Sequence, residues 1–212
     1  MRKGNADMCI GIEEREIAIR LVSVLVEKGI CEARSRSAME DLFDNELHNT
    51  GFNMWTGITK ACFVHEDLDD WVIKVGFSKG VSKNYARVEY ENYRAAIDSL
   101  LGWYFPFTDF LCEFEGVEFY IQERAECYED AITSNWYDMM LAWHEEMGHD
   151  LDSIDIWDEV YDLEDTEKIE LMFGDMALSS FLSEHRIGDL HEGNFGFIGD
   201  RTVIIDFSGY MG

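Results

Sequence analysis

The spacing of apolar residues changes several times along this chain, and the order of those changes limits the fold more than any other feature. Apolar residues three or four positions apart indicate helices, whereas alternation over short segments indicates strands. Helical spacing predicts helices over residues 13–28, 35–48, 84–101, 131–147 and 166–185. Alternation and turn residues predict strands over 58–65, 71–77, 110–115 and 117–123, with a closing hairpin over 195–205. The sequence therefore predicts an α+β fold in which helices flank a strand-rich block.

Acidic residues far outnumber basic ones. The 212 residues include 44 Asp and Glu against 17 Lys and Arg, which gives a net charge of −27. Such a surface repels phosphate backbones and anionic lipids, so we expect no direct nucleic-acid binding and no membrane partner. Sixteen acids and a single lysine fall within residues 126–170. The plain interpretation of that segment is a solvated helical face with an acidic loop. Halophilic adaptation, cationic partners and mimicry of DNA stay open.

The cysteines and the apolar runs indicate where such a chain resides. Apolar residues make up 47% of the chain, enough for a packed core, and the five cysteines contain no Cys-x-x-Cys pair. An odd number of unpaired cysteines fits reduced thiols better than a disulfide framework or a zinc site. The apolar run at 17–26 is interrupted by Arg20 and is too short to span a bilayer, and no signal peptide precedes it. We therefore expect a soluble, cytoplasmic protein.

Polar residues with oxygen ligands gather near the C-terminus. Asp189 and Asn194 lie five residues apart in an expected loop. Asp206 directly follows the second strand of the closing hairpin. A carboxylate and an amide oxygen that meet from the two sides of a hairpin suit Mg²⁺ bound together with nucleotide phosphates. Asp189 is then available to accept a proton from an attacking hydroxyl.

The run Asp-Leu-His-Glu-Gly-Asn over 189–194, followed by Ile-Asp-Phe over 205–207, resembles the catalytic loop and metal-binding aspartate of the protein-kinase-like superfamily. The Asp-Leu-His motif most resembles that of the aminoglycoside phosphotransferases and divergent bacterial or phage kinases. The resemblance implies a two-lobed fold, ATP and Mg²⁺ as cofactors, and transfer of the γ-phosphate to a hydroxyl. It assigns the positioning of that hydroxyl to Asp189 and metal binding to Asn194 and Asp206.

A lysine and a glutamate upstream match two further parts of this family. Lys74 lies between aliphatic residues in an expected strand and resembles the lysine that reaches the α- and β-phosphates, although an exposed edge-strand lysine is the ordinary alternative. The next helix offers Glu89 or Glu91 as its partner. At ~100° per residue, Glu89 lies within ~40° of the apolar stripe, while Glu91 lies ~140° from Ala96. A buried acid needs a partner, so we expect Glu89 to face Lys74 and Glu91 to face solvent.

Residues 119–126 resemble the strand and hinge that join the two lobes. The resemblance places the backbone of Glu123 and Ala125 against adenine, with Gln122 just before the hinge. The domains expected from it are an N-terminal helical extension over 1–50, a nucleotide-binding lobe over 51–123, and a reduced helical lobe over 124–212.

The chain also departs from the family pattern. Only Gly51 and Gly57 are available where the family's glycine-rich loop should precede the lysine strand, and they lack Gly-x-Gly-x-x-Gly spacing. Ile187 stands two residues before the loop aspartate, where His or Tyr is usual, and Ser208 replaces the glycine of Asp-Phe-Gly. Six residues follow the metal-binding aspartate, so we expect no activation segment and no later lobe helices. In their place we expect the N-terminal helices over 13–48 to pack against the shortened lobe.

The acceptor and the alternatives follow from charge and from these departures. The acidic segment at 126–170 falls in the lobe where aminoglycoside-type relatives bind their acceptor, which favours a cationic small molecule or a basic protein. The irregular glycine loop favours an alternative, a catalytically inactive pseudokinase that acts as a binding module. Charge alone favours another, an acidic DNA mimic that inhibits a nucleic-acid-binding protein.

Two other patterns are interpreted as structural. His144 and His149 lie ~140° apart on a continuous helix, so we expect them not to share a metal. Trp136, Trp143 and Trp157 are expected in the core or capping the helical lobe.

Overall fold

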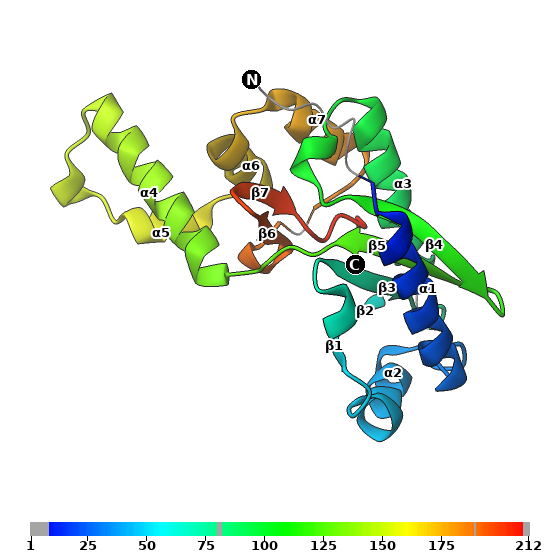
Figure 1. Cartoon of the computed structure of the whole chain (residues 1–212). Helices are drawn as coiled ribbons and strands as arrows, with labels where there is room; N and C mark the ends of the chain where they lie inside the picture. The colour runs from blue at the N-terminus through cyan, green and yellow to red at the C-terminus, as the bar shows by residue number, and fades with distance from the viewer. Residues whose placement is uncertain (1–8, 80–81, 189, 210–212) are drawn as a thin grey trace. The chain divides into compact units, whose positions relative to one another are not determined.

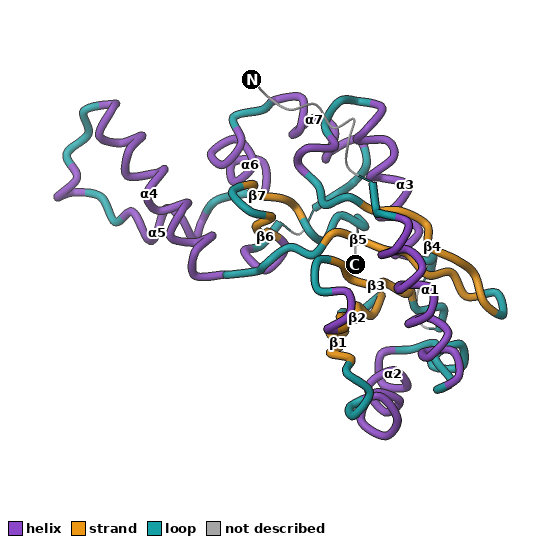
Figure 2. The backbone as a smooth tube through the Cα atoms, in the orientation of Figure 1, coloured by secondary structure: helices purple, strands orange, loops and turns teal. Residues whose placement is uncertain are grey.

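The computed structural model describes residues 9–79, 82–188 and 190–209, and these residues form an α+β protein, as predicted. The chain divides into two compact units, Met1–Arg124 and Ala125–Gly212, which are the N-terminal unit and the C-terminal unit. Figure 1 labels their helices and strands, and Figure 2 distinguishes helix, strand and loop along the same trace. The boundary falls within the segment that the sequence predicts as a hinge.

A five-stranded antiparallel sheet forms the centre of the N-terminal unit. Its strands, in the spatial order β1-β2-β3-β5-β4, are β1 (Phe52–Thr56), β2 (Lys60–His65), β3 (Trp71–Gly76), β5 (Val117–Glu123) and β4 (Thr108–Phe114). The predicted hairpin of β2 and β3 is confirmed and turns through the 3-10 segment η3 (Glu66–Leu68). Strand β1 was not predicted, because the adjacent apolar residues Met54 and Trp55 break its alternation and Trp55 is exposed.

Different helices cover the two faces of this sheet. The helices α1 (Ile12–Glu27) and α2 (Arg36–Leu42), with the π-helical turn η2 (Phe43–Leu47), share one apolar cluster with the sheet residues Phe63, Ile73 and Ile121. These three residues are aligned across β2, β3 and β5 and therefore share a face. The expectation that the N-terminal helices pack against the helical lobe was wrong for their apolar stripe. Leu21 and Leu25 are buried in the core of the sheet unit instead.

Helix α3 (Tyr85–Asp98) lies between β3 and β4 in the chain and contributes to the other side of the sheet. Its N-cap is Asn84, whose Oδ1 accepts hydrogen bonds from the N–H groups of Ala86 and Arg87 at 3.1 and 3.2 Å. It ends earlier than the predicted boundary at 101, because Leu100 has a left-handed φ of 62° and an exposed side chain. The short segment η4 (Gly102–Tyr104) then leads into β4.

The described part of the C-terminal unit combines helices with a two-stranded hairpin. The elements are α4 (Glu129–Met147), η5 (Leu151–Ser153), α5 (Ile156–Asp162), α6 (Asp165–Phe173), α7 (Met176–Glu184), η6 (Glu192–Asn194), β6 (Phe195–Ile198) and β7 (Arg201–Ile204). The single helix predicted over 166–185 was wrong, because Gly174 adopts a left-handed φ of 58° and ends α6. Asp175 then caps α7 through the N–H groups of the next turn. Helix α5 was not predicted, and Asp155 caps it in the same way.

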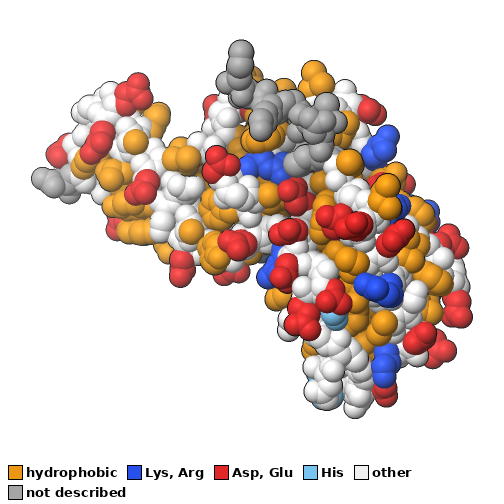
Figure 3. Space-filling model, in the orientation of Figure 1, with side chains coloured by type: hydrophobic (Ala, Val, Ile, Leu, Met, Phe, Trp, Pro, Cys, Tyr) orange, Lys and Arg blue, Asp and Glu red, His pale blue; other side chains and the backbone are white. Residues whose placement is uncertain are grey.

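The surface agrees with the composition in most respects. Acidic side chains are spread over the visible face of the molecule (Figure 3). Of the three tryptophans expected in the core or capping the lobe, Trp136 is buried against Phe195, whereas Trp143 and Trp157 are 47% and 42% exposed. The five cysteines are all free thiols. No helix in the described ranges is long and apolar enough to cross a bilayer.

Candidate functional site

Lys74 lies in the middle of β3, on the face of the sheet opposite the apolar cluster. In the antiparallel register it pairs with Cys62 of β2, and Lys60 lies two residues before Cys62. Side chains two residues apart in a strand point to the same face. Lys60 and Lys74 therefore share a face, and each side chain is only 6% exposed.

Glu89 of α3 holds both lysines. Its Oε2 accepts a hydrogen bond from Lys74 Nζ at 2.9 Å, and its Oε1 lies 3.0 Å from Lys60 Nζ. The Glu89 side chain is fully buried. Breaking a buried ion pair by removing one partner typically costs about 3–5 kcal/mol, because a charge is left buried. The predicted Lys74–Glu89 pair is thus present, and one carboxylate fixes the positions of two ammonium groups.

The helix period selected Glu89 correctly, but sequence reasoning missed Lys60. Glu91 is exposed, as expected from its place on the other side of α3. Lys60 opens β2 directly after a turn, where a lysine is commonplace and nothing marks it as buried. The signal that would have found it is the register: with residues 66–70 as the turn, Lys60 falls on the same face as Lys74.

Strand β5 ends in the segment predicted to be the hinge. Gln122 is buried, and its Nε2 donates to Thr108 Oγ1 at 3.0 Å. The N–H of Glu123 donates to the carbonyl of Phe107, in the loop before β4, at 2.8 Å. The N–H groups of residues 124 and 126 donate to backbone carbonyls of two other segments at 2.8 and 2.9 Å. No described residue accepts a hydrogen bond from the N–H of Ala125. A backbone donor of this kind suits a ligand with a polar, planar edge.

In the C-terminal unit, the closing hairpin brings Asn194 and Asp206 to the same end. The ladder of β6 and β7 is extended by a hydrogen bond from the N–H of Ile205 to the carbonyl of Asn194 at 2.9 Å. Asp206 is the next residue, so the two candidate metal ligands come from neighbouring positions where the strands separate. The third member of the predicted set, Asp189, lies outside the described residues.

Ser208 orients Asp206, a role that the sequence did not suggest. Its Oγ donates to Asp206 Oδ1 at 3.0 Å, and Phe207 between them is fully buried. Gly209 follows with a φ of 64°, and a Cβ there would lie 2.7 Å from the carbonyl oxygen of Arg186. Residue 209 must therefore be glycine. The hydrogen bond from the Ser208 hydroxyl holds the Asp206 carboxylate in one orientation.

The donor set at this end of the hairpin suits a hard cation that brings further ligands with it. Mg²⁺ commonly takes one or two protein oxygens and completes its shell with phosphate oxygens and water. In the part of the chain that the structure describes, no group of three or more His, Cys, Asp or Glu side chains could hold a metal. The amide oxygen of Asn194 and the carboxylate of Asp206 are donors of the type that Mg²⁺ accepts.

The turn between β1 and β2 precedes the lysine strand, as the family's glycine-rich loop would. A Cβ added to Gly57 would meet no atom closer than 3.9 Å, so this position does not need glycine. The next residue, Ile58, is exposed. The turn contains Gly57 but lacks the Gly-x-Gly-x-x-Gly spacing of the family's loop.

His144 and His149 are in contact, so placing them on one continuous helix was wrong. Helix α4 ends at Met147, and Gly148 reverses the chain with a φ of 71°. The two Nδ1 atoms lie 2.8 Å apart, and His144 Nε2 lies 2.7 Å from Glu159 Oε2. The imidazole of His144 thereby links the end of α4 to α5.

An acidic groove runs along α4, α5 and α6. Its volume is 730 Å³, within the range of small-molecule sites. Apolar side chains, among them Trp143, line it together with Asp158, Glu159, Asp162, Glu167 and Glu170. Glu159 contacts His144, and Glu167 caps α6. The other three carboxylates have no cationic partner among the described residues.

No protein-family model, curated protein or solved structure matches the chain.

Proposed function

We propose that this protein is an ATP- and Mg²⁺-dependent phosphotransferase of the protein-kinase-like type, which moves the γ-phosphate to a hydroxyl group. The observation that carries the proposal is the buried pair of Lys74 and Glu89 at 2.9 Å. Helix period alone chose Glu89 over Glu91, and the pair is the one that the sequence resemblance calls for. A lysine held by a carboxylate of the neighbouring helix is in a fixed position to receive phosphate oxygens.

The N-terminal unit would bind the nucleotide. Lys74 contacts the α- and β-phosphates. Lys60 supplies a second ammonium group, next to a β1–β2 turn without the family's glycine spacing. The backbone of Glu123 and Ala125 contacts the adenine edge. Catalysis would then depend mainly on positioning and on neutralising phosphate charge.

In this proposal the C-terminal unit supplies the metal ligands and the group that positions the acceptor. Asn194 and Asp206 would hold Mg²⁺, which would supply positive charge beside the phosphates, and Ser208 keeps the Asp206 carboxylate oriented. Asp189 positions the acceptor hydroxyl and accepts its proton. The acceptor oxygen forms a bond to the γ-phosphorus, the bond to the bridging oxygen breaks, and ADP leaves.

The acceptor would be cationic, either a small molecule or a basic segment of a protein. The acidic groove supports this, because three of its carboxylates, Asp158, Asp162 and Glu170, have no cationic partner among the described residues. The apolar wall that includes Trp143 would take the uncharged part of such a molecule. Replacing these three acids by their amides should raise KM for the acceptor and leave kcat little changed.

A binding experiment tests the nucleotide site. MgATP should raise the melting temperature of the wild-type protein and of the control Asp200→Asn, which alters an exposed turn residue. Lys74→Met should lose most of this shift, and Asp206→Ala should lose the difference between ATP with Mg²⁺ and ATP with EDTA. An unchanged shift in Lys74→Met would contradict the proposed site.

A turnover experiment distinguishes an enzyme from a pseudokinase. The pseudokinase is the alternative that the irregular glycine spacing of the β1–β2 turn favours. ADP release and mass spectrometry of the acceptors would be measured with aminoglycosides, simple amino alcohols and a lysine-rich protein. A phosphorylated product that disappears in Asp189→Asn supports the phosphotransferase. MgATP binding without any phosphorylated product would contradict the phosphotransferase and indicate that the protein is a binding module.

A further inference from the structure

A small pocket lies in the N-terminal unit at the end of β3. Residues 76–78 and 82–84 line it, together with the turn between β4 and β5 and Arg34 from the segment before α2. Its volume is 240 Å³. Since a water molecule takes about 30 Å³ of liquid, the pocket has room for a phosphate group with a few further atoms.

Arg34 is anchored in this pocket by its backbone rather than by its charge. Its carbonyl accepts hydrogen bonds from the N–H groups of Ser78 and Lys79 at 3.2 and 2.9 Å. In the side chain, Nη1 makes one long contact of 3.5 Å to the carbonyl of Cys31. The Nε atom is buried without a hydrogen-bond partner, and Arg34 forms no ion pair with any described residue. Nε is enclosed by protein atoms, whereas the outer guanidinium nitrogens make only the single long contact from Nη1 and so retain donors for a ligand.

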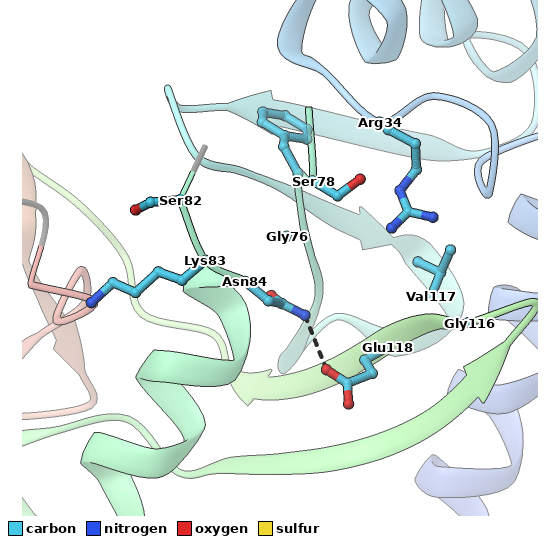
Figure 4. A pocket seen from close by; sticks show the side chains of 10 residues that line it. Arg34, Gly76, Ser78, Ser82, Lys83, Asn84, Gly116, Val117 and Glu118 are labelled. Carbon is cyan, nitrogen blue, oxygen red and sulfur yellow. Dashed lines mark hydrogen bonds between the residues drawn. The ribbon is translucent and has the colours of Figure 1, made fainter. Parts of the chain in front are cut away.

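Arg34 and Ser78 both direct polar groups toward the pocket (Figure 4). Figure 4 shows the guanidinium of Arg34 and the hydroxyl of Ser78 directed into the same hollow beside Gly76. Lys83 is directed away from the hollow, and its Nζ lies over the ring of Tyr85 at 5.0 Å from the centroid. Two hydrogen-bond donors from different segments of the chain thus converge on one space.

The carboxylate in the pocket, Glu118, does not serve Arg34. Its Oε2 accepts hydrogen bonds from Asn84 Nδ2 at 3.0 Å, from Arg87 Nε at 2.8 Å and from the hydroxyl of Tyr120 at 2.9 Å. Its Oε1 accepts from Arg87 Nη2. Arg87 therefore neutralises the charge of Glu118, and the positive charge of Arg34 remains to attract an anion.

The acids nearest to this corner weaken that attraction only partly. Glu32 and Glu115 both act electrostatically on the neighbouring Cys31, as Arg34 does. Both are exposed, so water and salt screen their charges. The amino end of α3, which begins at Asn84, adds the positive end of a helix dipole on the same side.

We propose that this pocket binds a phosphate oxyanion, either as free phosphate or as a small phosphate ester. The planar guanidinium of Arg34 offers two donors in a fork, and the Ser78 hydroxyl offers a third from another direction, which suits the oxygens of a phosphate group. The ligand would touch the N-cap of α3 and so stabilise the helix that carries Glu89. Neither Lys60 nor Lys74 lines the pocket, although Lys60 pairs with the lining residue Gly76 across β2 and β3. The proposed anion site does not depend on phosphotransferase activity.

The test compares thermal unfolding of the full chain in millimolar phosphate, glycerol phosphate, sulfate, acetate and chloride at equal ionic strength. The variants are Arg34→Gln and the control Arg20→Gln, which removes the same charge from an exposed position of α1. Lys74→Met is included because phosphate at the nucleotide site would depend on that lysine. Circular dichroism checks that each variant folds.

Phosphate should stabilise the wild type, Arg20→Gln and Lys74→Met above the chloride reference. Arg34→Gln should need roughly tenfold more phosphate or more for the same shift, because a charged hydrogen bond is lost. A larger effect of glycerol phosphate would identify an ester as the ligand, and an equal effect would identify free phosphate. The proposal is overturned if Arg34→Gln responds like the wild type, if acetate is as effective as phosphate, or if phosphate has no effect beyond that of chloride.

Discussion

Replacing Glu89 by glutamine keeps the shape of the side chain but removes the charge that holds two lysines. The Glu89 side chain is fully buried, with Lys74 Nζ at 2.9 Å and Lys60 Nζ at 3.0 Å. Removing one partner of such a buried pair costs about 3–5 kcal/mol, and in a chain of this length each kcal/mol lowers the melting temperature by about 2–4 °C. Glu89→Gln should therefore melt roughly 6–20 °C below the wild type, as measured by circular dichroism.

The matched control is Glu91→Gln, two residues along the same helix on its exposed side. This variant should change the free energy of unfolding by less than about 0.5 kcal/mol. Because the Glu89 cluster is buried, the difference between the two variants should persist in high salt. If Glu89→Gln and Glu91→Gln melt at the same temperature, the inference that the cluster stabilises the fold is wrong.

A double-mutant cycle then measures how the two lysines share the carboxylate. In Lys60→Met or Lys74→Met, Glu89 keeps the other lysine, whereas the double variant removes both. The double variant should lose more stability than the sum of the single variants, by about 0.5–3 kcal/mol. Additive losses in urea unfolding would show that the lysines act independently.

Other properties follow from buried groups in the N-terminal unit. Cys112 should resist iodoacetamide at about pH 8. Burial raises the pKa of its thiol to about 11 and outweighs the lowering by nearby Arg15. Mass spectrometry should find the exposed Cys9 modified first. Burial alone would raise the pKa of Glu118, but hydrogen bonds led by that from Arg87 lower it. The contribution of Glu118 to stability is therefore complete above the ordinary carboxyl pKa and is lost as the pH falls below it, so urea unfolding of Glu118→Gln should depend less on acid pH than that of the wild type. Leu25→Ala should cost about 2–5 kcal/mol in urea unfolding, since Leu25 is fully buried in the core of the sheet unit, and a cost below 1 kcal/mol would argue against that packing.

The sequence predicted what depends on periodicity. The β2–β3 hairpin, α3 and the closing hairpin follow from alternation and helical spacing, and the same spacing placed Glu89 on the buried side of its helix. It failed where one residue changes the backbone direction. Gly174 splits a predicted helix in two, and Gly148 turns His149 back onto His144.

Local patterns determined which side of a helix or strand each residue occupies, because side-chain direction repeats with the backbone geometry. They could not determine which segments pair, because pairing depends on residues far apart in the chain. Only the tertiary structure showed that Lys60 joins Lys74 on Glu89, that α1 covers the sheet, and that the hydroxyl of Ser208 holds Asp206. Each of these contacts forms only when strands far apart in the chain have paired in the correct register. That pairing depends on the packing of the whole unit.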